Sequence, residues 1–242
     1  MNSTDTQTQL ETLERDLERN RPRTRTRWVA AAAAAAAVVA ALVVVNVRGD
    51  DRTGTPADSV DTQVATDVAS DFMDAVASYD ADRAASYLAD DAGIQLRTST
   101  VDAASTSRQL RWNRAVGFRL IPRGCELESV SAPAATVACA YDVHGLGSER
   151  LGRGPFTDNV LRLTVVDDEI VSGVEEWGSD EFETTMWEPF TAWLLSNRAD
   201  EAAFMFADPP SATRPALTER SASLWARNVD RYVEAVARGD AW

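Results

Sequence analysis

The sequence predicts an α+β protein with one N-terminal transmembrane helix and a C-terminal helical extension. An uncharged run of 20 residues, 28–47, is long enough for a helix to span the roughly 30 Å of a bilayer's hydrocarbon core. Beyond it, apolar residues recur first at the helical spacing of three or four and then at the strand spacing of two. After Trp177 the helical spacing returns, so helices precede and follow a set of strands.

The run 28–47 favours a retained membrane anchor over a cleaved secretory signal. It follows 27 other residues, exceeds the 7–15 apolar residues of a signal, and ends without a small-x-small cleavage site. Residues 19–27 hold five Arg and no acid, whereas 48–61 hold two Arg and four Asp. The positive-inside rule therefore predicts a single-pass protein of the cell membrane, with a cytoplasmic tail at 1–27 and an extracytoplasmic remainder.

The outer part of the chain is strongly acidic. From residue 48 onward it has 18 Arg against 33 acids, within a whole chain of net charge -14. Such a surface argues against nucleic acid or an anionic lipid face as a partner, so the lipid bilayer is contacted only through 28–47. Residues 48–59 contain Gly49, Gly54 and Pro56 among charges and read as a linker.

Three helices are expected next. Val64, Val68, Phe72, Val76 and Tyr79 follow helical spacing. A short second helix covers 81–89 before Gly93, and after a brief apolar patch at 94–96 a third covers 102–113.

An antiparallel sheet follows. The strand period covers 116–122, 125–130, 136–143, 159–166 and 170–177. Short turns fall at 131–133 and 167–169, and a longer glycine-rich loop fills 144–155.

The C-terminal extension, 179–242, returns to helices. Asp180 and Glu183 form a plausible capping pair, and Pro189 predicts a kink. The last helix has the clearest apolar face, formed by Leu217, Ser221, Leu224, Trp225, Val229, Tyr232, Val233 and Val236.

Cys125 and Cys139 are expected to form a disulfide. Strands folded about Ala132 place the two residues directly opposite each other, with Leu127 opposite Val137 and Glu126 opposite Ala138. Two buried free thiols are the alternative, and the external location favours the bond. A metal site is not expected, because the only histidine is His144 and further ligands are missing.

The phrase "FMDAVASYDADRAASYLADDAG" and strands ending in "VSGVEEWGSDEF" resemble the nuclear-transport-factor-two-like superfamily, in particular membrane-anchored SnoaL-like proteins of actinobacteria. This resemblance implies that residues 60–178 form a cone-shaped domain of helices packed on a curved antiparallel sheet, with a pocket between them. It does not imply a reaction.

Enzymes on this fold, such as ketosteroid isomerase, use an Asp base and a Tyr–Asp oxyanion pair. Here Tyr79, Tyr87, Tyr141 and Asp142 lie near the corresponding elements, but none matches a motif position. We interpret Tyr79 and Tyr87 as core residues, Asp142 as facing away from Tyr141, and His144 as a solvated loop residue without a catalytic role. No catalytic residue is predicted.

Tyr79, Tyr141 and Trp177 are the candidate pocket residues. The predicted function is a membrane-tethered, non-catalytic external module that binds a small apolar ligand or a protein partner, without a cofactor. The alternatives are an isomerase- or cyclase-type enzyme that uses the cone pocket, and an assembly module that forms a homodimer through its sheet.

Overall fold

The computed structural model describes residues 61–97, 99–207 and 214–241, which belong to one compact unit. The predicted tail at 1–27, transmembrane helix at 28–47 and linker at 48–59 lie outside the described residues. Within the described ranges, no helix combines the length and apolar character needed to cross a bilayer.

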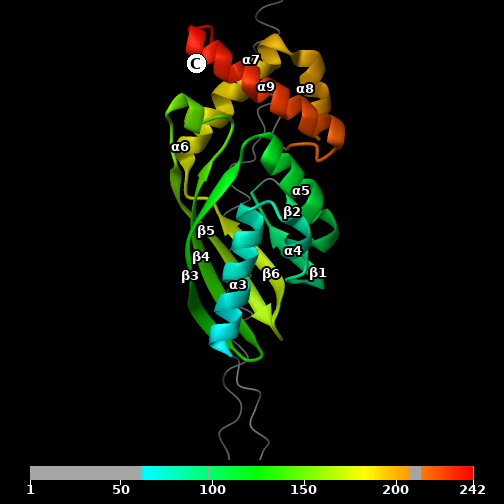
Figure 1. The fold of residues 1–242 in the computed structure, drawn as a ribbon, viewed down its shortest axis with the longest axis vertical. Coiled ribbons are helices and arrows are strands. Elements are labelled where there is room, and N and C mark those ends of the chain that lie inside the picture. The colour runs from blue at the N-terminus through cyan, green and yellow to red at the C-terminus, as the bar shows by residue number, and fades with distance from the viewer. Residues whose placement is uncertain (1–60, 98, 208–213, 242) are drawn as a thin grey trace, which may run out of the picture. The chain divides into compact units, whose positions relative to one another are not determined.

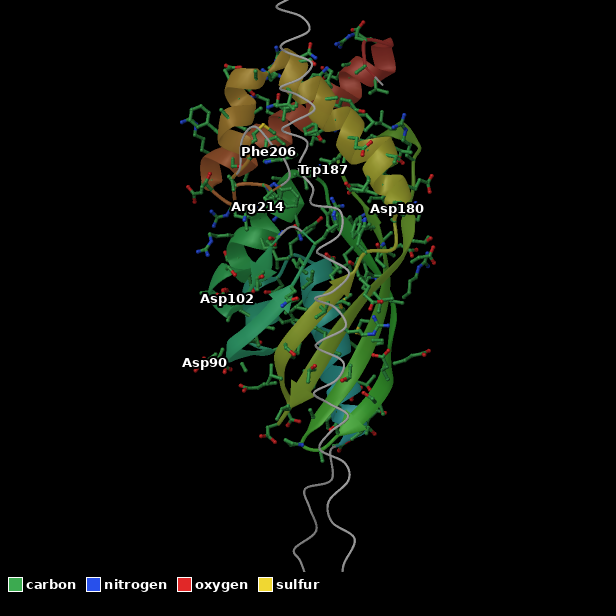
Figure 2. The ribbon with its side chains drawn as sticks, turned by 180° about the vertical axis from the view of Figure 1, so that it is seen from behind. Asp90, Asp102, Asp180, Trp187, Phe206 and Arg214 are labelled. Atoms are coloured by element: carbon green, nitrogen blue, oxygen red, sulfur yellow. A yellow bond between two sulfur atoms is a disulfide. The ribbon has the colours of Figure 1, made fainter. Side chains whose placement is uncertain are left out.

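A six-stranded sheet of order β2-β1-β6-β5-β4-β3 forms the centre of this unit. Its strands are β1 (Leu88–Gln95), β2 (Thr100–Val101), β3 (Arg119–Ser131), β4 (Ala134–His144), β5 (Phe156–Val166) and β6 (Glu169–Glu176). Helix α3 (Thr62–Ala77) lies across one face of the sheet, as Figure 1 shows. The opposite face, seen in Figure 2, carries none of the helices that the structure describes.

The remaining helices lie beside the sheet and at one end of it (Figure 1). They are α4 (Ala81–Ala85), α5 (Ala103–Ala115), the 3-10 turn η1 (Glu149–Leu151), α6 (Asp180–Phe182), the π-helical turn η2 (Glu183–Trp187), α7 (Glu188–Asn197), α8 (Ala199–Met205) and α9 (Glu219–Arg238). The core lies between the inner face of the sheet and these helices.

Helix α3 is confirmed, and its start has a local cause. The Asp61 carboxylate accepts hydrogen bonds from the backbone N–H groups of Gln63 and Val64, at 3.1 and 3.2 Å. These bonds satisfy two of the N–H groups that every helix start leaves unpaired. The buried face contains Ala65 and Ala69 next to Phe72, and small residues at these positions let the helix pack closely against the sheet.

The predicted helix at 81–89 is wrong beyond Ala85. Residues 88–95 instead form β1, which pairs parallel to β6, so the sheet is mixed and not wholly antiparallel. The register shifts between Leu88 and Gly93, and the bulge leaves Asp90 and Asp91 exposed. Because a bulge interrupts the alternation of two, the sequence of this strand carries no strand period.

The β3–β4 hairpin has the predicted register. Cys125 lies opposite Cys139, Glu126 opposite Ala138 and Leu127 opposite Val137. The two expected strands at 116–122 and 125–130 are one strand, joined through a register shift between Pro122 and Gly124. A disulfide joins Cys125 to Cys139.

The C-terminal helices begin differently from the prediction. The side chain of Ser179, not Asp180, caps α6 by accepting a hydrogen bond from the Phe182 N–H at 3.3 Å. Glu183 is therefore free of a capping role and forms an ion pair with Arg97. Pro189 follows the π-helical turn η2 within one unbroken helical run, 180–197, and has no N–H to donate to the Thr185 carbonyl four residues earlier. That carbonyl accepts a hydrogen bond from the Arg153 guanidinium instead.

Helix α9 docks through an aromatic cluster around Trp225. This side chain is fully buried, and its Nε1–H donates to the Met205 carbonyl at 3.0 Å. Its ring lies 5.5 Å from Trp112 of α5 and 5.3 Å from Phe190 of α7. The C-terminal extension is thus packed onto the helices that flank the sheet.

Candidate ligand-binding cavity

A cavity of about 120 Å³ lies between the inner face of the sheet, helices α3 and α5, and the turn η2. Most of the residues that line it are apolar: Phe72, Val76, Ile94, Leu96, Val101, Leu110, Trp112, Val116, Phe118, Leu120, Leu146, Leu161, Trp177, Phe182 and Trp187. The polar residues that line it are Arg97, Thr106, Gln109, Asn113, Tyr141 and Glu175.

The main polar feature of the cavity is a Tyr141–Glu175 pair. The Tyr141 hydroxyl donates to Glu175 Oε1 at 2.5 Å, and the backbone N–H of Arg97 donates to Glu175 Oε2 at 2.8 Å. Strand alternation explains the meeting, because Tyr141 on β4 and Glu175 on β6 both point to the inner face of the sheet. Each carboxylate oxygen therefore already accepts one hydrogen bond from the protein.

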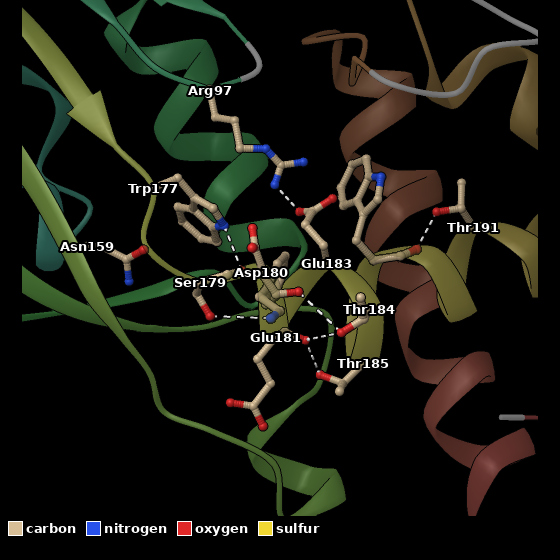
Figure 3. A network of polar contacts seen from close by, with 12 residues as sticks. Arg97, Asn159, Trp177, Ser179, Asp180, Glu181, Glu183, Thr184, Thr185 and Thr191 are labelled. Atoms are coloured by element: carbon tan, nitrogen blue, oxygen red, sulfur yellow. Dashed lines mark hydrogen bonds and ion pairs between the residues drawn. The ribbon is translucent and has the colours of Figure 1, made fainter.

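Arg97 connects the segment after β1 to the C-terminal turn η2, as Figure 3 shows. Its guanidinium forms an ion pair with Glu183, and its Cζ lies 5.6 Å from the centroid of the Trp177 ring. Trp177 is held in turn by its Nε1–H, which donates to the Ser179 carbonyl at 3.0 Å (Figure 3). Arg97, Trp177 and Glu183 thus form one partly exposed border of the site.

Burial shifts the pKa of two side chains that line the cavity, Tyr141 and Arg97. The pKa of Tyr141 is raised far above its ordinary value, first by burial and then by the charge and hydrogen bond of Glu175. Burial also lowers the pKa of Arg97, and the Glu175 carboxylate opposes that shift. Tyr141 therefore stays neutral, and Arg97 stays charged, at physiological pH.

The structure brings together two of the three predicted pocket residues. Tyr141 and Trp177 line the cavity, but Tyr79 does not. Tyr79 is half-buried, and its hydroxyl donates to the Phe118 carbonyl at 2.9 Å. Its expected place in the core with a satisfied hydroxyl is correct, and its expected place in the pocket is wrong.

Asp142 and His144 also lie outside the cavity lining. The Asp142 carboxylate accepts a hydrogen bond from Arg123 Nε at 2.6 Å. His144 is buried at the end of β4, with Nδ1 3.1 Å from Ser148 Oγ, so the interpretation of a solvated loop histidine is wrong.

Sequence reasoning missed Glu175 and Arg97. Glu175 could have been found, because the strand period predicted over 170–177 places it, two residues before Trp177, on the same face as that residue. Arg97 follows a strand that was not predicted and had no such signal. Among the residues that the structure describes, no group of three or more His, Cys, Asp or Glu side chains could hold a metal ion.

No protein-family profile and no curated protein matches the sequence. Among solved structures, a putative polyketide cyclase from Sinorhizobium meliloti is 16% identical over 46% of this chain and 94% of its own, with a TM-score of 0.35. A putative ketosteroid isomerase from Shewanella frigidimarina is 13% identical over 50% of this chain and 98% of its own, with a TM-score of 0.36.

A protein of unknown function from Mycobacterium tuberculosis spans more of the chain. It is 12% identical over 74% of this chain and 90% of its own, with a TM-score of 0.41. A likeness at this level does not transfer an activity from these proteins to this chain.

Proposed function

We propose that the chain binds a small, mostly apolar ligand in the cavity bordered by Tyr141, Glu175 and Trp177. The observation that carries this proposal is an apolar cavity with a few convergent polar groups, which is the usual form of a small-molecule site. Its volume of about 120 Å³ is close to that of an engineered cavity of about 150 Å³ that binds benzene. A ligand about the size of one ring therefore fits.

We favour binding over catalysis because the polar groups are already paired with each other. The only proton of the Tyr141 hydroxyl points to Glu175, and both oxygens of Glu175 accept protein N–H or O–H groups. A general base must reach the proton of its substrate, and an oxyanion donor must be free to donate. A role of Tyr141 as oxyanion donor would require this pair to separate, and a role of Glu175 as base would have to use the remaining lone pairs of oxygens that already accept hydrogen bonds.

An isomerase- or cyclase-type enzyme is the second candidate, in keeping with a proposed place in the SnoaL-like group. It is favoured by one observation, a carboxylate and a phenol within a largely apolar cavity. If such an activity exists, Glu175→Gln should lower its kcat by about 10²–10⁴, the usual contribution of a general base. A smaller change would leave binding as the function.

We further propose that residues 28–47 anchor this module in the cell membrane with the cavity outside. The proposal depends on the uncharged run and the arginines before it. Protease added to intact protoplasts should digest residues beyond about 58 and spare the N-terminal tail. Recovery of a mature form beginning near residue 58 from the medium would contradict it.

The binding proposal is tested by filling the cavity. Benzene and small substituted benzenes are titrated into the full chain and followed by NMR chemical-shift changes. Leu161→Trp, on the inner face of β5, should abolish saturable binding. Val174→Trp adds the same ring to an exposed position on the outer face of β6 and should leave binding unchanged.

Val101→Phe, on β2, is an independent filling variant if Leu161→Trp proves unstable. Binding that persists in both folded filling variants would place the ligand elsewhere and refute the proposal.

A further inference from the structure

The charges at the border of the cavity do not balance. One guanidinium, that of Arg97, faces two carboxylates. It forms an ion pair with Glu183, and its pKa is also affected by the charge of Glu175. No cation among the described residues lies within ion-pair distance of Glu175, whose hydrogen-bond donors are a phenol and a backbone N–H. The three side chains carry a net charge of -1 before a ligand enters.

A partly buried carboxylate that only neutral donors contact is incompletely compensated, because removing a charge from water is costly unless an opposite charge approaches. Glu175 is such a group, in a cavity that is otherwise lined mostly by apolar side chains. The one cation that lines the cavity, Arg97, is paired with Glu183. A cation in the cavity would supply the missing charge.

The walls of the cavity suit an organic cation. Among the lining residues are Trp112, Phe118, Trp177, Phe182 and Trp187. The negative faces of aromatic rings attract cations, by about 0.5–2 kcal/mol for each favourable contact. The molecule itself gives an example of this attraction, because Arg97 Cζ lies 5.6 Å from the Trp177 ring centroid.

From these observations we propose that the ligand of this cavity is a small organic ammonium ion, held by the Glu175 carboxylate and the surrounding aromatic rings. This inference rests on the proposed binding function and specifies its ligand class. The volume of about 120 Å³ accepts a head group such as trimethylammonium but not a large polycyclic molecule. The surplus of acids in the chain, with a net charge of -14, favours the approach of cations at low salt.

The test compares two probes of the same shape that differ in charge. Choline carries a quaternary nitrogen where 3,3-dimethylbutan-1-ol carries a carbon. Binding of both to the full chain is measured by NMR titration, with nuclear Overhauser contacts to the Tyr141 ring as evidence of place. Choline should bind at least about tenfold more tightly than the neutral alcohol.

Glu175→Gln should remove this preference while keeping the shape of the side chain. Glu176→Gln is the matched control, because Glu176 is the next residue on β6 and its carboxylate forms an ion pair with Arg162, away from the cavity. The control should keep the preference of the native chain. Loss of the preference in both variants would indicate a general effect of net charge and overturn the proposal.

The two probes also separate this inference from the function on which it rests. If the neutral alcohol binds as well as choline, the ligand class is wrong and the binding function stands. If choline, the alcohol and benzene all fail to bind, the proposed function fails with it. The comparison of probes on the native chain needs no variant, so it remains decisive even if Glu175→Gln does not fold.

Discussion

Reduction of the Cys125–Cys139 disulfide should lower the free energy of unfolding by about 2–3 kcal/mol without unfolding the protein. The bond closes a loop of 15 residues, counted from a sequence separation of 14. For a loop of that length the loss of chain entropy in the unfolded state corresponds to about 3 kcal/mol. We take this value as the upper end, because the hairpin turn at 131–133 already brings the two strands together in part of the unfolded ensemble.

The position of the disulfide at the edge of the sheet indicates that reduction affects mainly the β3–β4 hairpin. Strand β3 lies at the edge of the sheet and pairs on one side only, with β4. The core is built mainly from β4, β5 and the helices, so we expect it to stay intact when the bond is broken. The melting temperature should therefore fall by about 4–12 °C, given about 2–4 °C per kcal/mol for a domain of this size.

Urea unfolding of the full chain, followed by tryptophan fluorescence with and without reductant, measures the loss with every side chain kept in place. Unchanged m-values would show that the same surface is exposed in both states. A loss below about 0.5 kcal/mol, or complete unfolding on reduction, would refute the reasoning. Alkylation of the native protein without reductant should add no mass, and addition of two groups would show free thiols.

Three further predictions concern the same unit. Because the folded pKa of Tyr141 is raised, its contribution to stability is complete below the unfolded pKa of about 10 and declines as the pH rises above it. In urea unfolding at pH 9 to 11, Tyr141→Phe should make this decline smaller by about 1.4 kcal/mol in total over the range, and an unchanged decline would disprove the assignment. Asn228→Ala should lower the free energy of unfolding by about 1–3 kcal/mol, because the buried amide donates to Glu201 Oε2 at 2.7 Å and so links α9 to α8. An unchanged melting temperature of this variant would contradict the prediction. Gly178→Ala should shift the backbone next to Trp177, because an added Cβ would lie 1.9 Å from the Asp158 carbonyl oxygen. A lower melting temperature and altered tryptophan fluorescence are expected, and native values of both would count against the described packing.

Several elements could be predicted from the sequence because their causes are local. The apolar spacing of α3 and α9 selects a helix with one buried face, and Asp61 provides its own cap for α3. The register that joins Cys125 to Cys139 follows from the position of the turn and the alternation of two. Tyr141 and Trp177 line the cavity as expected, and both lie in segments, 136–143 and 170–177, that the strand period predicts.

Other features were decided only by tertiary structure. Strand β1 carries no strand period, and it becomes a strand because its backbone hydrogen bonds are completed by the distant β6 through a bulge. Tyr79 has the spacing of a pocket residue, but the backbone after α3 takes a left-handed turn at this residue, with φ of 59°, and directs its hydroxyl to the Phe118 carbonyl.

The cavity itself belongs to this second class. Its border depends on Arg97 and Glu183, which are 86 residues apart. Its lining also includes Trp187 of the π-helical turn, whose ring stacks on Trp225 of α9. By itself the sequence determined α3, α9, the hairpin and the disulfide, since each depends on neighbouring residues and on one repeating period. The site was decided by the tertiary structure, because only the folded chain brings a carboxylate, a guanidinium and aromatic rings from separate elements to one place.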